Sequence, residues 1–163
     1  VGSLPNQQAD PIEFISCGIA DTGCNKCVMG EKALGVYRRK LATSWLNEEI
    51  TWTSKEPRDF HFGGNSKVKT LGIVRLPVAP VGKVVYITVV IVPGTMPLLL
   101  SLHIMAQWYV IFRCREQIME VFGESHPFVY NNSGNIVLEL LPSKETAWLA
   151  WAPKVDSSKA AGN

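Results

Sequence analysis

The sequence lacks any apolar run long enough to cross a membrane. Its longest apolar run, from Val84 to Val92, is far shorter than the roughly 20 residues that a spanning helix needs. No stretch has the layout of a secretory signal peptide. These absences predict no membrane partner and a soluble protein of the cytoplasm or another intracellular compartment, or a segment cut from a larger chain.

Charge is also scarce, since charged residues make up 18% of the chain against an average of roughly 25% for soluble domains. The net charge is +2, and the densest basic groups are Arg38-Arg39-Lys40 and Lys67-Val68-Lys69. Such scattered groups indicate solvated faces, so no nucleic acid is expected to bind through this domain. With five Trp, six Phe and four Tyr, part of the apolar surface is expected to be covered by a partner.

The chain has four cysteines, and only Cys24 and Cys27 have a suggestive spacing. A structural zinc site needs two more ligands at similar spacing, which Cys17, Cys114 and the three histidines do not supply. A thioredoxin-like redox motif needs a βαβ pattern around it, which the sequence lacks. We therefore expect free thiols in a reducing compartment, with no metal and no cofactor.

What the sequence does contain is mostly β-forming. The run Val84 to Val92 is rich in β-branched residues and predicts a central strand buried on both faces. A β-run at Phe60-His61-Phe62 and another from Val68 to Val78 flank a Gly-Gly-Asn-Ser cluster, which predicts a hairpin. Further short strands are expected at residues 14–20, 98–100, 109–113, 117–122, 127–130 and 136–141.

Two helices are expected among these strands. From Glu31 to Trp45, apolar residues recur at spacings of three and four and form one stripe. Ser101 is expected to cap a short helix from Leu102 to Ala106. The order of elements predicts a mostly β barrel or sandwich in residues 12–142. A flexible arm in residues 1–11 and a polar, mostly disordered tail in residues 143–163 are expected on either side.

One stretch has the residue types for chemistry. The apolar run from Phe14 to Ala20 leads directly into Asp21-Thr22-Gly23-Cys24. A carboxylate at the end of a buried strand is costly unless hydrogen bonds or a function keep it there. The alternative is a β-turn in which Asp-x-Gly serves only the backbone, and the tripeptide alone favours that interpretation.

Two later motifs, in order, change this balance. They are Phe60-His61-Phe62-Gly63-Gly64-Asn65 and Pro97-Leu98-Leu99-Leu100-Ser101. With the Asp-Thr-Gly stretch, they make residues 14–142 resemble the retroviral-type aspartic proteases (retropepsins), most closely the protease segments of LTR-retrotransposon polyproteins. The resemblance implies a closed or partly open acid-protease barrel, with one longer helix after the catalytic loop and one short helix late.

The resemblance also implies an aspartic-type endopeptidase that matures a polyprotein. Asp21 would be the catalytic acid or base, and Thr22 would hydrogen-bond across a two-fold axis. Gly23 would let the backbone approach the substrate closely. Leu99 and Leu100 would support the catalytic loop from behind. Substrate-binding and flap residues would be Asn25, Phe60, His61, Phe62, Gly63, Gly64 and Asn65.

This chemistry needs two carboxylates roughly 3 Å apart that share one proton. Their repulsion separates the two titrations, so that one group acts as a base and the other as an acid. The chain has a single Asp-Thr-Gly, because Asp156-Ser157-Ser158 lies in the polar tail with no strand before it. The resemblance therefore implies a homodimer in which each copy supplies one Asp21 to a peptide or polyprotein substrate.

The sequence departs from the family at three places. The family commonly pairs an acidic residue two places after the glycine with an arginine in the late helix, where this chain has Asn25 and Leu102. Both charges are missing together, so no buried charge is left unpaired. Ser101 stands where many members have glycine, and the insertion between Gly30 and Pro57 is longer than in compact viral enzymes. Residues 136–141 are expected to be the terminal strand that interleaves at the dimer interface.

Two other functions fit parts of the sequence. The same fold could serve as a catalytically weak or inactive module for dimerisation or peptide binding, which the missing charged pair leaves open. A thiol enzyme would use Cys24 with His61 or His103, but nothing in the local sequence activates a thiolate.

Overall fold

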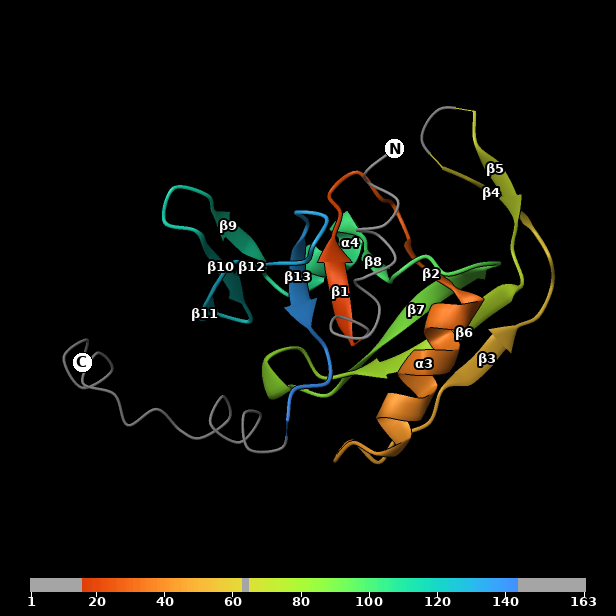
Figure 1. Ribbon diagram of the computed structural model, residues 1–163, viewed down its shortest axis with the longest axis horizontal. Coiled ribbons are helices and arrows are strands. Elements are labelled where there is room, and N and C mark those ends of the chain that lie inside the picture. The colour runs from red at the N-terminus through yellow and green to blue at the C-terminus, as the bar shows by residue number, and fades with distance from the viewer. Residues whose placement is uncertain (1–15, 63–64, 144–163) are drawn as a thin grey trace.

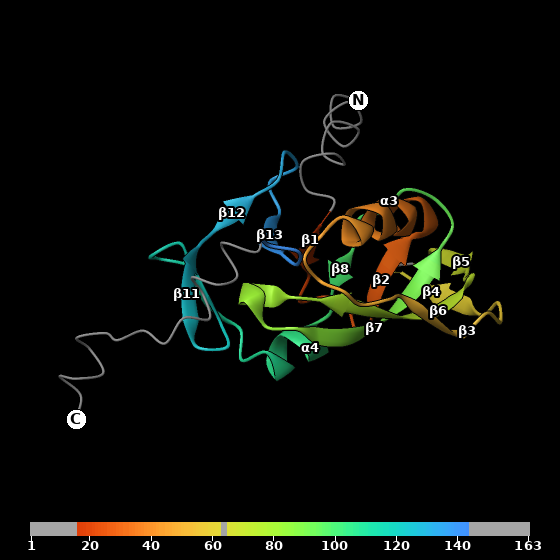
Figure 2. The same ribbon diagram turned by 90° about the horizontal axis from the view of Figure 1, so that it is seen from below.

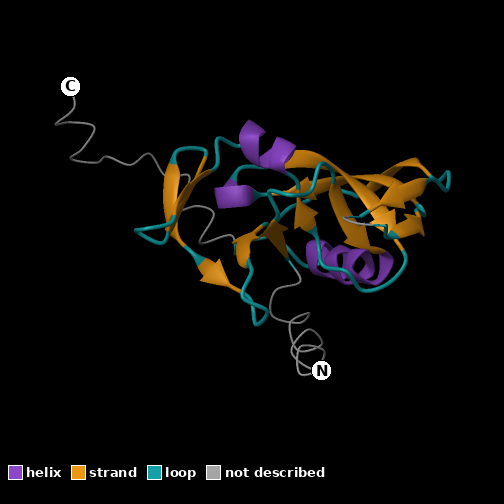
Figure 3. Cartoon of the chain, turned by 90° about the horizontal axis from the view of Figure 1, so that it is seen from above, coloured by secondary structure: helices purple, strands orange, loops and turns teal. Residues whose placement is uncertain are grey.

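A computed structural model describes residues 16–62 and 65–143 (Figure 1). Strands make up most of the regular secondary structure (Figure 3), and they form an eight-stranded mixed sheet, a three-stranded sheet and a two-stranded hairpin. The prediction of a mostly β domain with one longer and one short helix is confirmed. The arm at residues 1–11 and residues 144–163 of the tail lie outside the described residues, so the domain bounds stay a prediction.

The main sheet has the strand order β12-β13-β1-β8-β2-β7-β6-β3. Its two edges, β12 and β3, do not pair with each other, so in the part of the chain that the structure describes the sheet stays open rather than closing into a barrel. Its strands are β1 (Cys17–Ala20), β2 (Cys27–Gly30), β3 (Thr51–Ser54), β6 (Gly72–Val78), β7 (Val85–Val92), β8 (Leu99–Leu100), β12 (Val129–Tyr130) and β13 (Ile136–Glu139).

Strand β7 lies in the interior of the main sheet, parallel to β2 and antiparallel to β6. Val89 and Ile91 are buried in the main core, while Val90 and Val92 belong to a smaller core on the other face. Thr88, by contrast, is exposed. The predicted central strand is therefore confirmed, but it is buried on both faces only from Val89 onward.

Helix α3 (Glu31–Ala42) packs against β2 and β7 (Figure 2). Leu34, Tyr37 and Leu41 of the predicted stripe are buried, and the Tyr37 hydroxyl donates to the carbonyl of Pro77 at 2.7 Å. The helix ends three residues before Trp45, which the sequence had placed within it. The chain leaves the helix at Ala42, where the backbone N–H groups of the next two residues still bond to the last turn.

The predicted hairpin consists of β4 (Asp59–His61) and β5 (Lys67–Lys69), which pair in antiparallel fashion. The prediction of a single strand from Val68 to Val78 is wrong, because the strand is interrupted between β5 and β6. Gly72 has a φ of +144°, and a Cβ there would lie 2.2 Å from the carbonyl oxygen of Ser54. A glycine at this position allows both the bend and the close approach of β3. The alternation of apolar and polar residues in the sequence predicts neither of them.

A small sheet follows helix α4 (Leu102–Gln107) and lies at the opposite end of the molecule from the hairpin (Figures 1 and 2). It consists of β9 (Ile111–Arg113), β10 (Ile118–Val121) and β11 (Glu124–Pro127). The strand expected at residues 127–130 is split, since Pro127 ends β11 and β12 pairs with β13 in the main sheet.

Within the described residues, no helix is both long and apolar enough to cross a membrane.

The last predicted strand, at residues 136–141, is found as β13. It pairs with β1 over Val137–Glu139 and with β12 only at Ile136 and Val137 of the same chain. A strand exchanges backbone hydrogen bonds with one neighbour on each side, so β1 occupies one edge of β13 and β12 occupies the start of the other. The expectation that residues 136–141 interleave with a second copy stays a prediction.

Candidate active site

The candidate site is the loop that joins β1 to β2. Strands β1 and β8 pair in parallel, with Ala20 opposite Leu100, and the N–H of Asp21 donates to the carbonyl of Leu100 at 3.2 Å. The Gly23 N–H donates to Asp21 Oδ1 at 3.0 Å, and the Cys24 N–H donates to the Asp21 carbonyl at 3.1 Å. A turn of this kind fixes the aspartate just where the strand pairing ends.

This loop is open to solvent. Thr22, Gly23 and Asn25 are exposed, and Asp21 is partly buried. Among the described residues, only Gly23 hydrogen-bonds to the Asp21 carboxylate. The sequence had suggested a poorly solvated carboxylate, and a single chain does not provide that environment. A second group can therefore reach the carboxylate from outside.

Leu99 and Leu100 lie on β8, directly beside the loop. Leu100 is fully buried in the main core, and Leu99 packs against two smaller clusters, one around Ile19 and one around Val90. The close fit extends to β1, because a Cβ on Gly18 would lie 2.5 Å from Cγ of Leu100. The absence of a side chain at Gly18 lets Leu100 pack tightly behind the strand that carries Asp21.

Helix α4 is tied to the same loop. The Ser101 hydroxyl accepts a hydrogen bond from the Ile104 N–H at 3.2 Å, which confirms the predicted cap. The Ser101 N–H also donates to Cys27 Sγ at 3.4 Å, and the Leu102 N–H donates to the Cys24 carbonyl at 3.0 Å. Serine is therefore accommodated at this buried position, because its polar atoms are hydrogen-bonded.

The part played by Cys27 was missed from the sequence. The Cys-x-x-Cys spacing suggested only metal or redox chemistry, whereas Cys27 Sγ lies 3.6 Å from Ser101 Oγ in a buried contact. The two residues are 74 positions apart, so no local pattern could have paired them. Burial raises the pKa of the Cys27 thiol, which keeps it protonated and able to donate.

The aromatic hairpin lies over the same small core as the loop. Phe60 and Phe62 pack edge to face, with ring centroids 5.0 Å apart. Both pack against the cluster of buried valines from β2 and β7, and so do Cys24 and Leu99. The structure therefore brings the hairpin, the Asp21 loop and β8 onto one apolar cluster, which consists of Val28, Val90 and Val92.

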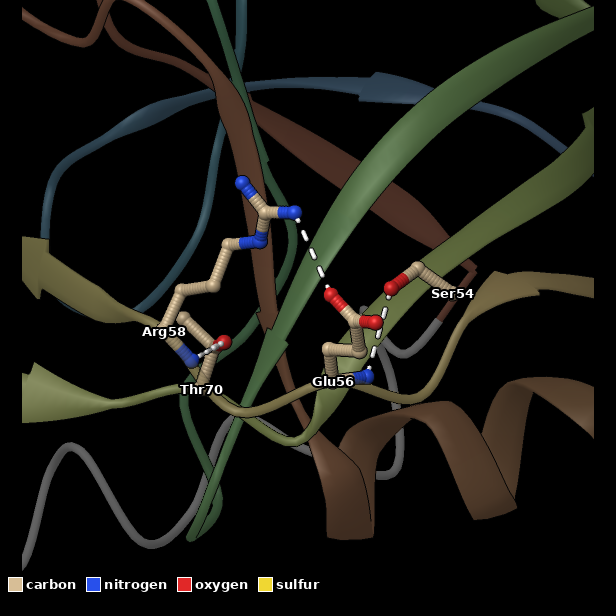
Figure 4. Close-up of polar contacts among 4 residues, drawn as sticks. All are labelled: Ser54, Glu56, Arg58 and Thr70. Atoms are coloured by element: carbon tan, nitrogen blue, oxygen red, sulfur yellow. Dashed lines mark hydrogen bonds and ion pairs between the residues drawn. The ribbon is translucent and has the colours of Figure 1, made fainter.

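Two other predicted hairpin residues, His61 and Asn65, are exposed. Gly63 and Gly64, expected at the hairpin tip, lie outside the described residues. The root of the hairpin is held by Thr70, which is buried and which the sequence did not single out. The Arg58 N–H donates to Thr70 Oγ1 at 3.0 Å (Figure 4). The Thr70 N–H donates to the Arg58 carbonyl at 2.7 Å.

Comparison with known proteins gives one kind of match. No family model matches the sequence, and no curated protein matches it. Among solved structures, the chain is similar to the crystal structure of the retroviral protease-like domain of Ddi1 from Leishmania major. The identity is 13% and the TM-score is 0.46, and the match covers 71% of this chain and 88% of that chain. A likeness this distant says nothing about the chemistry of the site, and closeness to retrotransposon proteases stays a prediction.

The described residues do not assemble a thiol site around Cys24. Its Sγ donates to the Lys26 carbonyl at 2.7 Å rather than to an imidazole. Burial raises the pKa of the Cys24 thiol, and the nearby Asp21 charge raises it further. His61 and His103 are both exposed, and His103 Nε2 lies 3.0 Å from Gln107 Nε2. A nucleophilic cysteine needs the opposite shift of its pKa.

A hollow of about 520 Å³ lies elsewhere, at the C-terminal end of α3. Arg38, Glu48 and Glu49 are among the residues that line it, and none of its lining residues belongs to the Asp21 loop. No group of His, Cys, Asp and Glu within the described residues is arranged to hold a metal ion. The candidate chemistry therefore lies on an exposed loop, outside this hollow.

Proposed function

We propose that this chain is one half of an aspartic endopeptidase, completed when two copies join about a two-fold axis. The observation that carries the proposal is the position of Asp21, which stands at the end of β1 on an exposed loop. Its carboxylate has Gly23 as its one hydrogen-bond donor within the described residues. The flanking β8 segment and the aromatic hairpin share one apolar cluster with this loop.

In the proposed dimer, two Asp21 carboxylates approach within roughly 3 Å and share one proton. The ionised carboxylate removes a proton from water, which attacks the peptide carbonyl carbon. The protonated carboxyl group assists the carbonyl oxygen. Thr22, which is exposed beside Asp21, would hydrogen-bond across the axis. An enzyme of this kind needs no cofactor.

Gly23 supports a role that goes beyond the single chain. A Cβ at this position would meet only Asp21 Oδ1, at 3.4 Å, which is an ordinary contact. Nothing else in the described protomer requires a glycine here. Close approach by a peptide backbone supplies a reason, because a side chain at this position would stand between the substrate and the loop.

The substrate we propose is an extended segment of a polyprotein. It would add as a strand between the hairpin and the loop, so that main-chain hydrogen bonds give affinity and side-chain pockets give specificity. Phe60 and Phe62 present partly buried aromatic rings on the hairpin, which favours apolar side chains near the cut. Asn25, which is exposed on the loop, would contact the substrate at its edge.

The test is peptide hydrolysis as a function of protein concentration at mildly acidic pH. A dimer built from half-sites loses specific activity on dilution, because dissociation destroys the site. Asp21→Asn should lower kcat at least about a hundredfold, the range of a lost acid–base group, while leaving a folded dimer. Unchanged hydrolysis by Asp21→Asn, or a specific activity that stays constant down to monomer concentrations, would end the proposal.

A second candidate is a binding module of the same fold without catalysis. The observation that favours it is the absence of the charged pair, since Asn25 and Leu102 are both uncharged and exposed. A pepstatin-type transition-state analogue separates the two functions. An enzyme should bind it with a rise in Tm, whereas a non-catalytic module should show no shift and should bind peptides equally well after Asp21→Asn.

A further inference from the structure

An exposed apolar side chain lies directly beside the Asp21 loop. Leu102, the first residue of α4, is 53% exposed. Its backbone N–H donates to the Cys24 carbonyl at 3.0 Å, so its position is fixed relative to the loop. Of the large apolar side chains that are exposed in the described residues, Leu102 is the one whose backbone bonds to this loop.

The exposed face of α4 also carries no permanent charge. Ala106 lies one turn after Leu102 and is exposed as well, so the two form a short apolar stripe. His103 and Gln107, the polar residues of the helix, bond to each other at 3.0 Å. In a two-fold interface, a residue near the axis meets its own copy, so a charged helix would meet like charge. An uncharged helix avoids this repulsion.

We propose that Leu102 and the exposed face of α4 form part of the contact with a second copy of this chain. The inference rests on the proposed function, in which a second Asp21 comes within roughly 3 Å of the first. A surface that brings the two carboxylates so close must also cover the neighbours of the loop. Leu102 is such a neighbour, and removing its apolar surface from water favours association.

The most informative substitution is Leu102→Asp. Aspartate is compatible with the first turn of a helix, where its charge interacts favourably with the helix dipole, so α4 should be retained. In the dimer, however, it would place one added negative charge from each copy in or beside the contact. Leu102→Ala, which removes apolar area without adding charge, serves as a second variant and should have a smaller effect in the same direction.

The matched control is Val84→Asp, which adds the same charge at another exposed apolar position. Val84 is 40% exposed and follows the short 3-10 helix η1 (Pro80–Gly82). Ala79, directly before η1, donates its N–H to the carbonyl of Leu140. Leu140 follows Glu139, which pairs with Cys17. Cys17 begins β1 and Asp21 follows its end, so this segment lies at the other end of the strand.

Sedimentation equilibrium of the full 163-residue chain measures the dissociation constant of the dimer. We expect Leu102→Asp to raise this constant at least about tenfold and Val84→Asp to change it less than about twofold. Equal dissociation constants for Leu102→Asp and the unmodified chain would overturn the inference but leave the proposed function standing. Equal weakening by Val84→Asp would also overturn it, because any added charge would then suffice. An unmodified chain that is active as a monomer would overturn both.

Hydrogen exchange gives a test that needs no variant. In the unmodified chain, the backbone amides of residues 102–107 should exchange more slowly above the dissociation constant of the dimer than below it. The amides of η1 should not change. Exchange in α4 that is independent of concentration would contradict the proposal even if the Leu102 variants failed to fold.

Discussion

At the scale of single residues, Gly18 and Gly23 both lie near Asp21, but they leave space for different neighbours. Gly18 faces Leu100, whose Cγ would lie 2.5 Å from an added Cβ, whereas Gly23 faces only Asp21 Oδ1 at 3.4 Å. The first glycine is therefore required by the packing of one chain. In our account, the second is required by the substrate.

A pair of alanine variants tests this difference. Gly18→Ala should lower the free energy of unfolding by about 1–3 kcal/mol, the usual cost of overpacking a core. Gly23→Ala should leave the unfolding free energy within about 0.5 kcal/mol of the unmodified chain, as for a tolerated surface change. It should nevertheless lower kcat/KM for a peptide substrate. Equal destabilisation by both variants, measured by thermal unfolding, would contradict the contacts described for Gly23.

Ser101 offers a second test at this scale. Its hydroxyl caps α4 and contacts Cys27 in a buried environment. Ser101→Ala removes the cap and leaves the Ile104 N–H without its acceptor, so unfolding should become easier by about 0.5–2 kcal/mol. Ser101→Thr keeps the hydroxyl and is the matched control. A loss as large for threonine as for alanine would show that space, and not the hydrogen bond, decides the residue.

At the scale of elements, the hairpin β4–β5 is supported by a small group of charges. Asp59 lies 2.9 Å from Lys69 Nζ and 3.8 Å from Lys67 Nζ. The hydrogen bond from Lys69 is the largest cause that lowers the pKa of Asp59, and the charges of Lys69 and Lys67 lower it further. A lowered folded-state pKa means that this support is present above the unfolded pKa. It is lost as the pH falls through the folded one.

Titration of the Asp59 carboxyl by NMR tests this arrangement. Lys69→Met should raise the pKa of Asp59 toward its ordinary value, because it removes both the hydrogen bond and the nearer charge. Lys67→Met should raise the same pKa less, and it is the matched control. A larger effect from Lys67→Met would show that the register of the two strands differs from the pairing of Asp59 with Lys69.

The elements also show which features of the fold can be predicted from the sequence. The buried stripe of α3, the Ser101 cap and the interior position of β7 were all predicted, because each depends on residues close together in the chain. The break at Gly72 and the two-sided pairing of β13 were not, since both depend on a strand from elsewhere in the chain. Local periodicity carries no information about such partners.

The candidate site follows the same rule. Asp21 and the hairpin were predicted from motifs, and the structure adds that Cys24 of the Asp21 loop packs on the same apolar cluster as Phe60 and Phe62 of the hairpin. The contacts of Cys27 with Ser101 and of Thr70 with Arg58 had no sequence signal, because each joins residues 12 or more positions apart. Roles for Thr22, Gly23 and Asn25 remain proposals, since each would act on a second chain or on a substrate.

At the scale of the whole molecule, we propose that one chain is an incomplete enzyme. The chain has one Asp-Thr-Gly, and its loop is exposed and lies outside the hollow at the end of α3. A two-fold dimer would give this loop the second carboxylate that the reaction requires. The apolar face of α4 then serves as a neighbouring part of the same contact.

The most direct measurement mixes the unmodified chain with Asp21→Asn at a fixed total concentration, after the subunits have exchanged. If each site needs both carboxylates, mixed dimers are inactive and activity falls as the square of the unmodified fraction. An equal mixture should then retain about a quarter of the activity of the unmodified chain. An equal mixture that retains about half would show that each chain carries a complete site, and it would contradict the account.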